Sequence, residues 1–436
     1  MKSEVLIYAP KLTNRLRFAA DFIFESILGV TANYTDKKED ALATSLPLIV
    51  YGDPFEKGIS IPSAGIINET GVHKLEPVHS KWDDTDIFFP VHGETDLPFD
   101  LFGAAFYLLS RYEEYNEIKR DIHGRPIATN TLMGRNQILH LPLIDQWALK
   151  LASFIQKKYP EWNFAERKYQ YIPTIDVDNA WMYLNKGSFR TWGAMLKLLV
   201  KGKFGEIKKR IRVLQQKEQD PYNVYNTLFA IHNGANLRAK YFFLFAGYSK
   251  YDKGCNIHNI AFRRLIARVN DYAEIGIHPS YYTIENKKRM HEEVRRMSNF
   301  LEEPVTSSRQ HFLRLKLPET YTELVNCRIR NDFSMGFADS IGFRTGTCTP
   351  HLFYDLEIET PVNIKIFPLA IMDTTLNRYM HLSPDEAKSE ALKIYTEVKK
   401  VNGTLVTLWH NESMGGVNEW AGWENIYADL VRIFAV

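Results

Sequence analysis

Short apolar runs, each followed by an acidic or histidine residue, recur through the second half of the chain. Residues 171–175 lead to Asp176 and Asp178, and residues 273–277 lead to His278. Each run is short and apolar enough to form a buried strand. Polar groups that follow successive strands are typical of the active site of a β/α barrel, where the carboxyl ends of the strands meet.

A helix is predicted between two further runs near the C-terminus. Ser383 suits an N-cap, Pro384 suits the first helical position, and Glu386 completes a capping box. The helix is expected to end near Gly403, because glycine is favoured just beyond helix C-termini.

Strands are predicted on both sides of this helix. Residues 364–372 form an apolar run that ends at Asp373, and residues 404–409 form another that ends at His410. A strand, a helix and a second strand in succession favour parallel β/α connectivity.

Residues 1–167 are predicted to form a smaller α/β domain that precedes the barrel. Pro160 follows the last predicted helix of this region, so we place the domain boundary in the next segment and the second domain at 168–436. The predicted elements are strands at 5–8 and 48–52 and helices at 14–28, 102–115 and 144–157.

Three charged residues, Arg111, Glu113 and Glu114, lie near the end of the helix predicted at 102–115. They could line a binding groove, or they could form a solvated helix end, which is the more common role of such residues.

Residues 181–238 form a long insertion that a minimal barrel would not need, and a strand at 240–245 follows it. Basic and apolar residues alternate at its centre, which predicts a pair of amphipathic helices. These helices could pack on the barrel, rest on an anionic membrane or clasp an anionic polymer. The basic residues are Lys197, Lys201, Lys203, Lys208, Lys209, Arg210 and Arg212.

The composition is that of a folded globular protein. The chain has 436 residues, of which 45% are hydrophobic, and this length allows two domains with their own cores. A net charge of +2 predicts no general attraction to nucleic acid. Three separated cysteines, Cys255, Cys327 and Cys348, argue against a disulfide framework or a zinc finger.

The apolar stretch at 5–9 is too short for a signal peptide, because Pro10 and Lys11 interrupt it. No run approaches the roughly 18 apolar residues of a membrane span. We therefore expect a cytoplasmic protein.

The acidic and histidine residues at the strand ends are suited to metal-assisted hydrolysis. Carboxylates and imidazoles can hold a divalent ion that polarises a carbonyl and activates a water, while a second carboxylate accepts the proton of that water. Taken singly, an Asp-x-Asp pair is often a turn or a helix cap. The ordered set of such residues at strand ends is what favours a site.

The first two of these motifs resemble those of the NodB-type polysaccharide deacetylases, carbohydrate esterases that remove N- or O-acetyl groups from sugars. Residues 174–178 (Thr-Ile-Asp-Val-Asp) resemble the first motif, which implies a catalytic base at Asp176 and a metal ligand at Asp178. Residues 277–280 resemble the second motif, which implies a metal ligand at His278.

Three later segments extend the resemblance. Residues 342–354 resemble the third motif through Gly-Phe-Arg, whose Arg344 would orient the base. Asp373 would correspond to the aspartate of the fourth motif, although its neighbours are unusual. Residues 405–410 resemble the fifth motif, which implies a general acid at His410. The resemblance covers about residues 169–436 and implies a distorted, NodB-like β/α barrel.

The chain departs from the family pattern in the second motif. A second metal-binding histidine usually follows the first by four residues, and Tyr282 occupies that position. A neutral tyrosine is a poor ligand for a divalent ion. His311, at the exit of another short extended segment, is the candidate third ligand, with an ordinary buried or surface histidine as the alternative.

The resemblance implies a metal-dependent hydrolase that removes an acetyl group from an N-acetylated sugar of a polysaccharide or glycan precursor. Asp176 would accept the proton of the water, Arg344 and Asp373 would hold Asp176, and His410 would protonate the leaving nitrogen. The ion would be zinc, with cobalt, nickel or manganese as alternatives. Trp409, Tyr281 and Tyr354 could contact a sugar ring.

The expected partners are an acetylated sugar or glycan, without nucleic acid, and the basic insertion could contact the inner face of a membrane. An alternative function is a catalytically inactive barrel that binds glycan or scaffolds polysaccharide assembly, which Tyr282 motivates. A third reading, hydrolysis of a formyl amide or an ester, would use the same residues.

Overall fold

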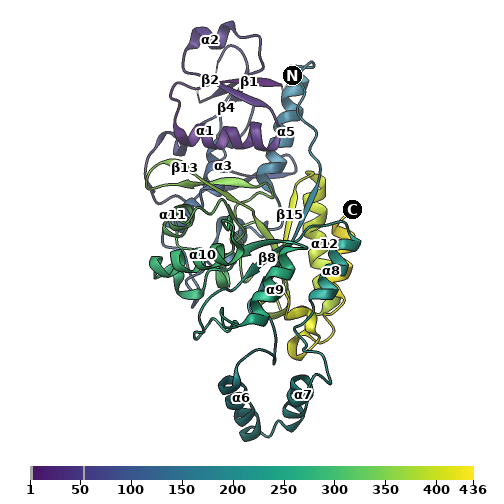
Figure 1. The fold of residues 1–436 in the computed structure, drawn as a ribbon. Coiled ribbons are helices and arrows are strands. Elements are labelled where there is room, and N and C mark those ends of the chain that lie inside the picture. The colour runs from purple at the N-terminus through teal and green to yellow at the C-terminus, as the bar shows by residue number, and fades with distance from the viewer. Residues whose placement is uncertain (1–2, 53–54) are drawn as a thin grey trace.

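The N-terminal part of the protein is built on a parallel four-stranded sheet. The computed structural model describes residues 3–52 and 55–436 (Figure 1). The first sheet has the strand order β2-β1-β3-β4, and a separate antiparallel pair, β5 and β6, follows it. The strands are β1 (Glu4–Tyr8), β2 (Thr31–Thr35), β3 (Leu48–Tyr51), β4 (Ile59–Ile61), β5 (His79–Trp82) and β6 (Thr85–Phe88).

The predicted N-terminal strands and helices are present, and two of the three predicted helices are shorter than expected. The helix predicted at 102–115 stops at Leu109, and Arg111 has a positive φ of 55° before a 3-10 turn. The helix predicted at 14–28 is α1 followed by a π-helical segment, Phe22–Ile27. The α-helices of this part are α1 (Asn14–Asp21), α2 (Lys38–Ala43), α3 (Leu101–Leu109), α4 (Leu132–Arg135) and α5 (Leu143–Lys158).

The second sheet has nine strands and curls strongly. Its order is β12-β13-β11-β10-β9-β8-β7-β15-β14, and every pair is parallel except β12 with β13. The strands are β7 (Gln170–Val177), β8 (Lys240–Phe243), β9 (Glu274–Ile277), β10 (Ser307–Ser308), β11 (Asn331–Asp332), β12 (His351–Asp355), β13 (Thr360–Ile366), β14 (Leu369–Met372) and β15 (Thr404–His410).

The curl arises because one continuous segment, 360–372, pairs with strands on both sides of the sheet. Its first part, β13, pairs with β11, whereas its last part, β14, pairs with β15. The sequence predicted a single strand at 364–372, but the strand breaks at Phe367 and Pro368. Proline has no backbone N–H to donate to a neighbouring strand, which accounts for the break.

Helices connect and cover the strands of this sheet. The capping box predicted at Ser383 and Glu386 is confirmed at the start of α12, with Pro384 as its first residue. The helices are α6 (Ser188–Val200), α7 (Phe204–Leu214), α8 (Tyr225–Gly234), α9 (Ile260–Asn270), α10 (Lys287–Leu301), α11 (Glu319–Asn326), α12 (Pro384–Lys400) and α13 (Ile426–Phe434).

The antiparallel pair β12–β13 contributes to the core of the N-terminal part. Tyr354 is fully buried, and its ring lies 5.0 Å from the rings of both Phe18 and Phe106. Beside it, Glu359 accepts a hydrogen bond of 2.8 Å from Nε of Arg15. Residues near 351–359 therefore complete a core whose other members lie before the predicted boundary at 167.

Candidate metal centre and catalytic pocket

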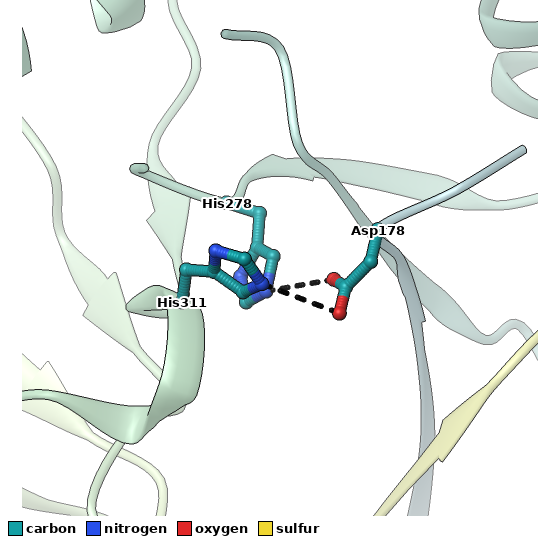
Figure 2. A group of neighbouring side chains, drawn as sticks. All are labelled: Asp178, His278 and His311. Carbon is teal, nitrogen blue, oxygen red and sulfur yellow. Dashed lines mark ion pairs between the residues drawn. The ribbon is translucent and has the colours of Figure 1, made fainter. Parts of the chain in front are cut away.

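Three side chains that the sequence predicted as metal ligands lie together at the carboxyl ends of three strands (Figure 2). Asp178 follows β7, His278 follows β9, and His311 follows β10. Their ligand atoms all lie within 4.8 Å of one another. Nε2 of His278 is 3.2 Å from Oδ1 of Asp178, and Nε2 of His311 is 3.3 Å from Oδ2 of the same carboxylate.

Each imidazole is held through its other ring nitrogen. Nδ1 of His278 lies 2.5 Å from the backbone oxygen of Arg309, and Nδ1 of His311 lies 2.9 Å from Oδ1 of Asp252. A proton on each Nδ1 satisfies these acceptors and leaves the lone pair of Nε2 directed at Asp178. This arrangement, with a carboxylate or a carbonyl behind each histidine, is common at metal sites in proteins.

The residues fit a divalent ion such as zinc. Two imidazoles and one carboxylate form a usual set of protein ligands for zinc and leave a position for water. Within the described residues, Oδ1 of Asp178 is buried and accepts no hydrogen bond, so it has a free lone pair for an ion. Asp252 was not predicted as part of the site, because it lies several residues beyond the strand-like run at 240–245 and not directly at its end.

Asp178 and His311 shift the pKa of each other. Burial lowers the pKa of His311, but the carboxylates of Asp178 and Asp252 outweigh this effect and raise it to about 9. Burial raises the pKa of Asp178, but the imidazoles of His311 and His278 outweigh it and hold this pKa well below its ordinary value. A bound cation would therefore compete with a proton at this position.

Asp176 lies beside the ligand cluster and is oriented by Arg309. Nη1 of Arg309 donates to Oδ1 of Asp176 over 2.9 Å and to the hydroxyl of Thr174 over 2.7 Å. Both Asp176 and Arg309 are buried, and Oδ2 of Asp176 is 3.7 Å from Nε2 of His278. Arg309 comes from the exit of β10, two residues before His311.

Arg344 does not orient Asp176, contrary to the sequence-based prediction. Its Nε and Nη2 atoms donate to the two carboxylate oxygens of Glu114, over 2.8 and 2.5 Å, and Nε of Arg111 donates to the same carboxylate over 2.8 Å. The three side chains are buried where the N-terminal part meets the second sheet. They therefore form neither a solvated helix end nor a binding groove.

Asp373 holds His410 rather than Asp176, which corrects a second assignment. Oδ1 of Asp373 lies 2.8 Å from Nδ1 of His410, and Oδ2 accepts a hydrogen bond of 2.7 Å from the backbone N–H of His410. Nε2 of His410 faces the cluster, 3.9 Å from Oδ2 of Asp178. Burial lowers the pKa of His410, but Asp373 outweighs burial and raises it to about 10.

The predicted base, the three predicted metal ligands and His410 line one cavity of about 320 Å³. The aromatic residues proposed from the sequence are elsewhere, since Trp409 and Tyr354 are buried in the two cores and Tyr281 stacks on Tyr251. The lining residues are Asp176, Asp178, His278, His311, His410, Gln310, Phe312, Leu313, Met372, Thr374, Arg378, Tyr379, Leu408, Glu412, Trp420 and Arg125.

One wall of the cavity comes from the N-terminal part of the chain. The guanidinium of Arg125 donates to the hydroxyl of Tyr379 over 2.7 Å and to the backbone oxygen of Phe312 over 3.0 Å. Asp121 accepts from Nε of the same side chain over 2.8 Å and so fixes its direction. Arg125 was not predicted, since its segment lies outside the strand-end pattern.

Comparisons with known proteins give a family model and distant structural similarities. The model, described as a family of unknown function (DUF7033), matches residues 5–160. No curated protein matches the chain.

Several solved structures are similar to this chain, among them the two that follow. One is a proposed polysaccharide deacetylase from Mycobacterium smegmatis, with 12% sequence identity and a TM-score of 0.39 over 61% of this chain and 85% of that one. The other is a mutant of a CE4 family pseudoenzyme with restored enzymatic activity, with 11% identity and a TM-score of 0.29 over 64% of this chain and 78% of that one. Both TM-scores are low, and neither similarity assigns a function to this chain.

Proposed function

We propose that this protein is a metal-dependent hydrolase that removes an acetyl group from the amide nitrogen of a sugar. The observation that carries the proposal is that a base and an acid, each held by a buried partner, both approach one ligand cluster. Asp176, held by Arg309, and His410, held by Asp373, both approach the cluster formed by Asp178 and the two histidines.

The chemistry follows from the protonation states of these residues. A divalent ion held by Asp178, His278 and His311 would polarise the substrate carbonyl and lower the pKa of a water. The carboxylate of Asp176 accepts the proton of this water as it attacks. The protonated imidazole of His410 then donates a proton from Nε2 to the leaving nitrogen, and Asp373 stabilises its positive charge.

The cavity supports a sugar amide as the substrate. A volume of about 320 Å³ admits an acetamido group together with part of a sugar ring. Tyr379 lines the cavity with 39% of its surface exposed and provides an aromatic ring against which a sugar can pack. Gln310 also lines the cavity, and its Nε2, which has no hydrogen-bond partner among the described residues, can donate to a substrate.

His311 supports an active enzyme over an inactive glycan-binding protein. The alternative was motivated by Tyr282, which cannot replace the second histidine of the motif. Tyr282 packs against Tyr251 and Tyr281, and His311 presents its imidazole to Asp178 from a different strand. A third metal ligand supplied by His311 would preserve metal-assisted hydrolysis without the second histidine of the motif.

The test combines metal content with acetate release. The purified full chain, supplied with zinc, cobalt, nickel or manganese in turn, should bind about one ion and release acetate from oligomers of N-acetylglucosamine. Asp178→Asn should lose both properties, whereas His410→Ala should keep the metal and lose turnover. Wild-type protein that binds no metal, or acetate release that survives in Asp178→Asn, would contradict the proposal.

A further inference from the structure

The helices α6 and α7 form a hairpin that projects from the body of the protein, at the end opposite the N-terminal sheet (Figure 1). None of the residues of α6 is buried, and Val213 is the one buried residue of α7. An amphipathic helix normally buries its apolar side against the protein. The apolar side of this hairpin therefore lacks such a partner within the described residues.

Large apolar side chains lie along one side of α6. Phe189, Trp192, Leu196 and Leu199 are spaced by three or four residues, which places them on one helical face. The exposed fractions are 93% for Phe189 and 71% for Trp192, so most of each aromatic ring is in contact with solvent. An exposed apolar surface of this kind on a folded protein marks an interaction site.

The apolar face continues around the turn into α7. Val200 and Phe204, on the two sides of the turn, are 80% and 65% exposed, and Ile211 and Leu214 are also exposed. Phe204, Ile211 and Leu214 are spaced by seven and three residues, so they share a face of α7.

The same hairpin is strongly basic. Residues 188–214 contain eight lysines and arginines and a single acidic residue, Glu206, in a chain whose net charge is only +2. Positions that neighbour the apolar face on α6 and α7 carry several of these cations. The eight are Arg190, Lys197, Lys201, Lys203, Lys208, Lys209, Arg210 and Arg212.

The base of the hairpin is fixed to the protein near the metal centre. Asp220 accepts backbone hydrogen bonds from Met182, Tyr183 and Leu184 over 2.8, 2.8 and 3.0 Å, which joins the two ends of the insertion. Arg190 donates to the backbone oxygen of Gly254 over 3.1 Å, and Asp252, two residues earlier, contacts His311. The hairpin therefore has a defined attachment on the side of the sheet where the cavity lies.

We propose that the α6–α7 hairpin binds an anionic lipid bilayer, with its apolar face in the interface and its basic residues on the lipid headgroups. Helices that lie in a membrane interface combine tryptophan, phenylalanine and leucine on one face with flanking lysines and arginines. Charge favours this partner, because each cation near an anionic surface adds to the affinity. A protein partner is less well matched, since lysine is depleted from protein interfaces.

The binding would be peripheral. Among residues 3–52 and 55–436, no helix combines the length and the apolar character needed to cross a membrane. The proposal does not depend on the hydrolase activity, and it would place the cavity close to substrates held at a bilayer.

Vesicle sedimentation with the full chain tests the proposal. Wild-type protein should bind vesicles of phosphatidylcholine that contain phosphatidylglycerol, and should bind vesicles of phosphatidylcholine alone more weakly by about tenfold or more. Its affinity for the anionic vesicles should fall as salt is added, because salt screens the attraction between the basic residues and the lipid headgroups. The variants are F189S/W192S/L196S for the apolar face and K208E/K209E/R212E for the charge. Each should weaken binding by about tenfold or more.

Two control substitutions are matched to these variants. Val78→Ser removes an exposed apolar side chain and Arg264→Glu reverses an exposed charge, both outside the hairpin, and binding should be unchanged. Acetate release from soluble oligomers should be the same in all these variants, so failure of lipid binding is separable from failure of the hydrolase proposal.

Three results would overturn the proposal. One is equal binding to neutral and anionic vesicles, and another is binding unaffected by the hairpin variants. The third is a wild-type protein that does not bind vesicles but self-associates as its concentration rises, as measured by light scattering. If F189S/W192S/L196S abolished this self-association, the apolar face would be assigned to contact with a second copy of the chain.

Discussion

Arg309 donates a hydrogen bond from Nη1 to Oδ1 of Asp176 over 2.9 Å, and both side chains are buried beside the metal centre. Arg309→Lys keeps the positive charge but loses the Nε donor, which bonds the backbone oxygen of Phe333 over 3.0 Å and fixes the direction of the guanidinium. We expect kcat for acetate release to fall by about 10²-fold, because a misdirected base loses most of its effect.

Arg344 provides the matched control for this prediction. Arg344→Lys breaks the paired contact with Glu114, so it should lower the melting temperature while kcat changes little. Equal losses of kcat in the two variants, at equal melting temperatures, would contradict the assignment of Arg309.

Asp373→Asn should change the pH dependence of turnover. Asp373 raises the pKa of His410 to about 10 against the effect of burial, so its neutralisation lowers that pKa. The acid form of His410 would then be lost at lower pH, and the alkaline limb of the kcat profile should move toward neutral pH. The dependence of kcat on pH is measured from about pH 6 to 10, where an imidazole with a raised pKa titrates, with the metal in excess. An unchanged alkaline limb would exclude His410 as the acid.

Asp252→Asn should weaken metal binding without removing a ligand. The side chain of Asp252 lies behind His311 and favours the tautomer whose Nε2 faces the site. Loss of such a partner typically lowers affinity by about 10–100-fold. Titration with zinc in a calorimeter measures this directly, with Asp271→Asn, an exposed aspartate after α9, as the control.

These predictions concern residues of two kinds, those that the sequence indicated and those that it did not. Asp176, Asp178, His278 and His410 follow short apolar runs, and the hydrophobic pattern is the strongest local signal for a strand and its exit. The parallel connectivity of the strands and the pair of helices in the insertion were predicted from the same kind of signal. The residue that orients Asp176 could not be found in this way, because a buried arginine contact depends on which strands become neighbours.

The error over Arg344 has a physical cause. A Gly-Phe-Arg sequence specifies a turn and a cation, but the partner of that cation, Glu114, lies 230 residues away in the chain. Burial of Glu114 likewise could not be inferred from a charged helix end, since exposed charges are the usual outcome there.

Glu114 should make stability depend on pH. Burial raises its pKa, but Arg344 and Arg111 outweigh burial and lower it from 4.5 to about 2. Because the folded pKa is depressed, this contribution is complete above pH 4.5 and is lost as the pH falls toward 2. Its size is on the order of 3 kcal/mol.

Urea unfolding measured across this pH range should therefore show a decline of the free energy of unfolding in the wild type. Glu114→Gln should decline less steeply and should be less stable at neutral pH, because both arginines lose their counter-charge. Parallel curves for the two proteins would mean that Glu114 does not titrate with the low pKa.

Arg125→Ala should affect substrate binding more than catalysis. The side chain supports the cavity wall through Tyr379 and Phe312 and touches none of the proposed acid, base or ligand residues. We expect KM for acetylated oligomers to rise by about tenfold while kcat is retained, the pattern of lost uniform binding. Arg135→Ala, in α4 and away from the cavity, is the control.

The contact of Tyr354 and Glu359 with Phe18 and Arg15 has a consequence for synthesis on the ribosome. Domains generally fold in order as they emerge, the N-terminal one first. Here the first core lacks its last members until the chain has been extended by more than 340 residues, the sequence separation of Arg15 and Glu359. The N-terminal core therefore cannot be completed during synthesis until the segment around Tyr354 and Glu359 has left the ribosome.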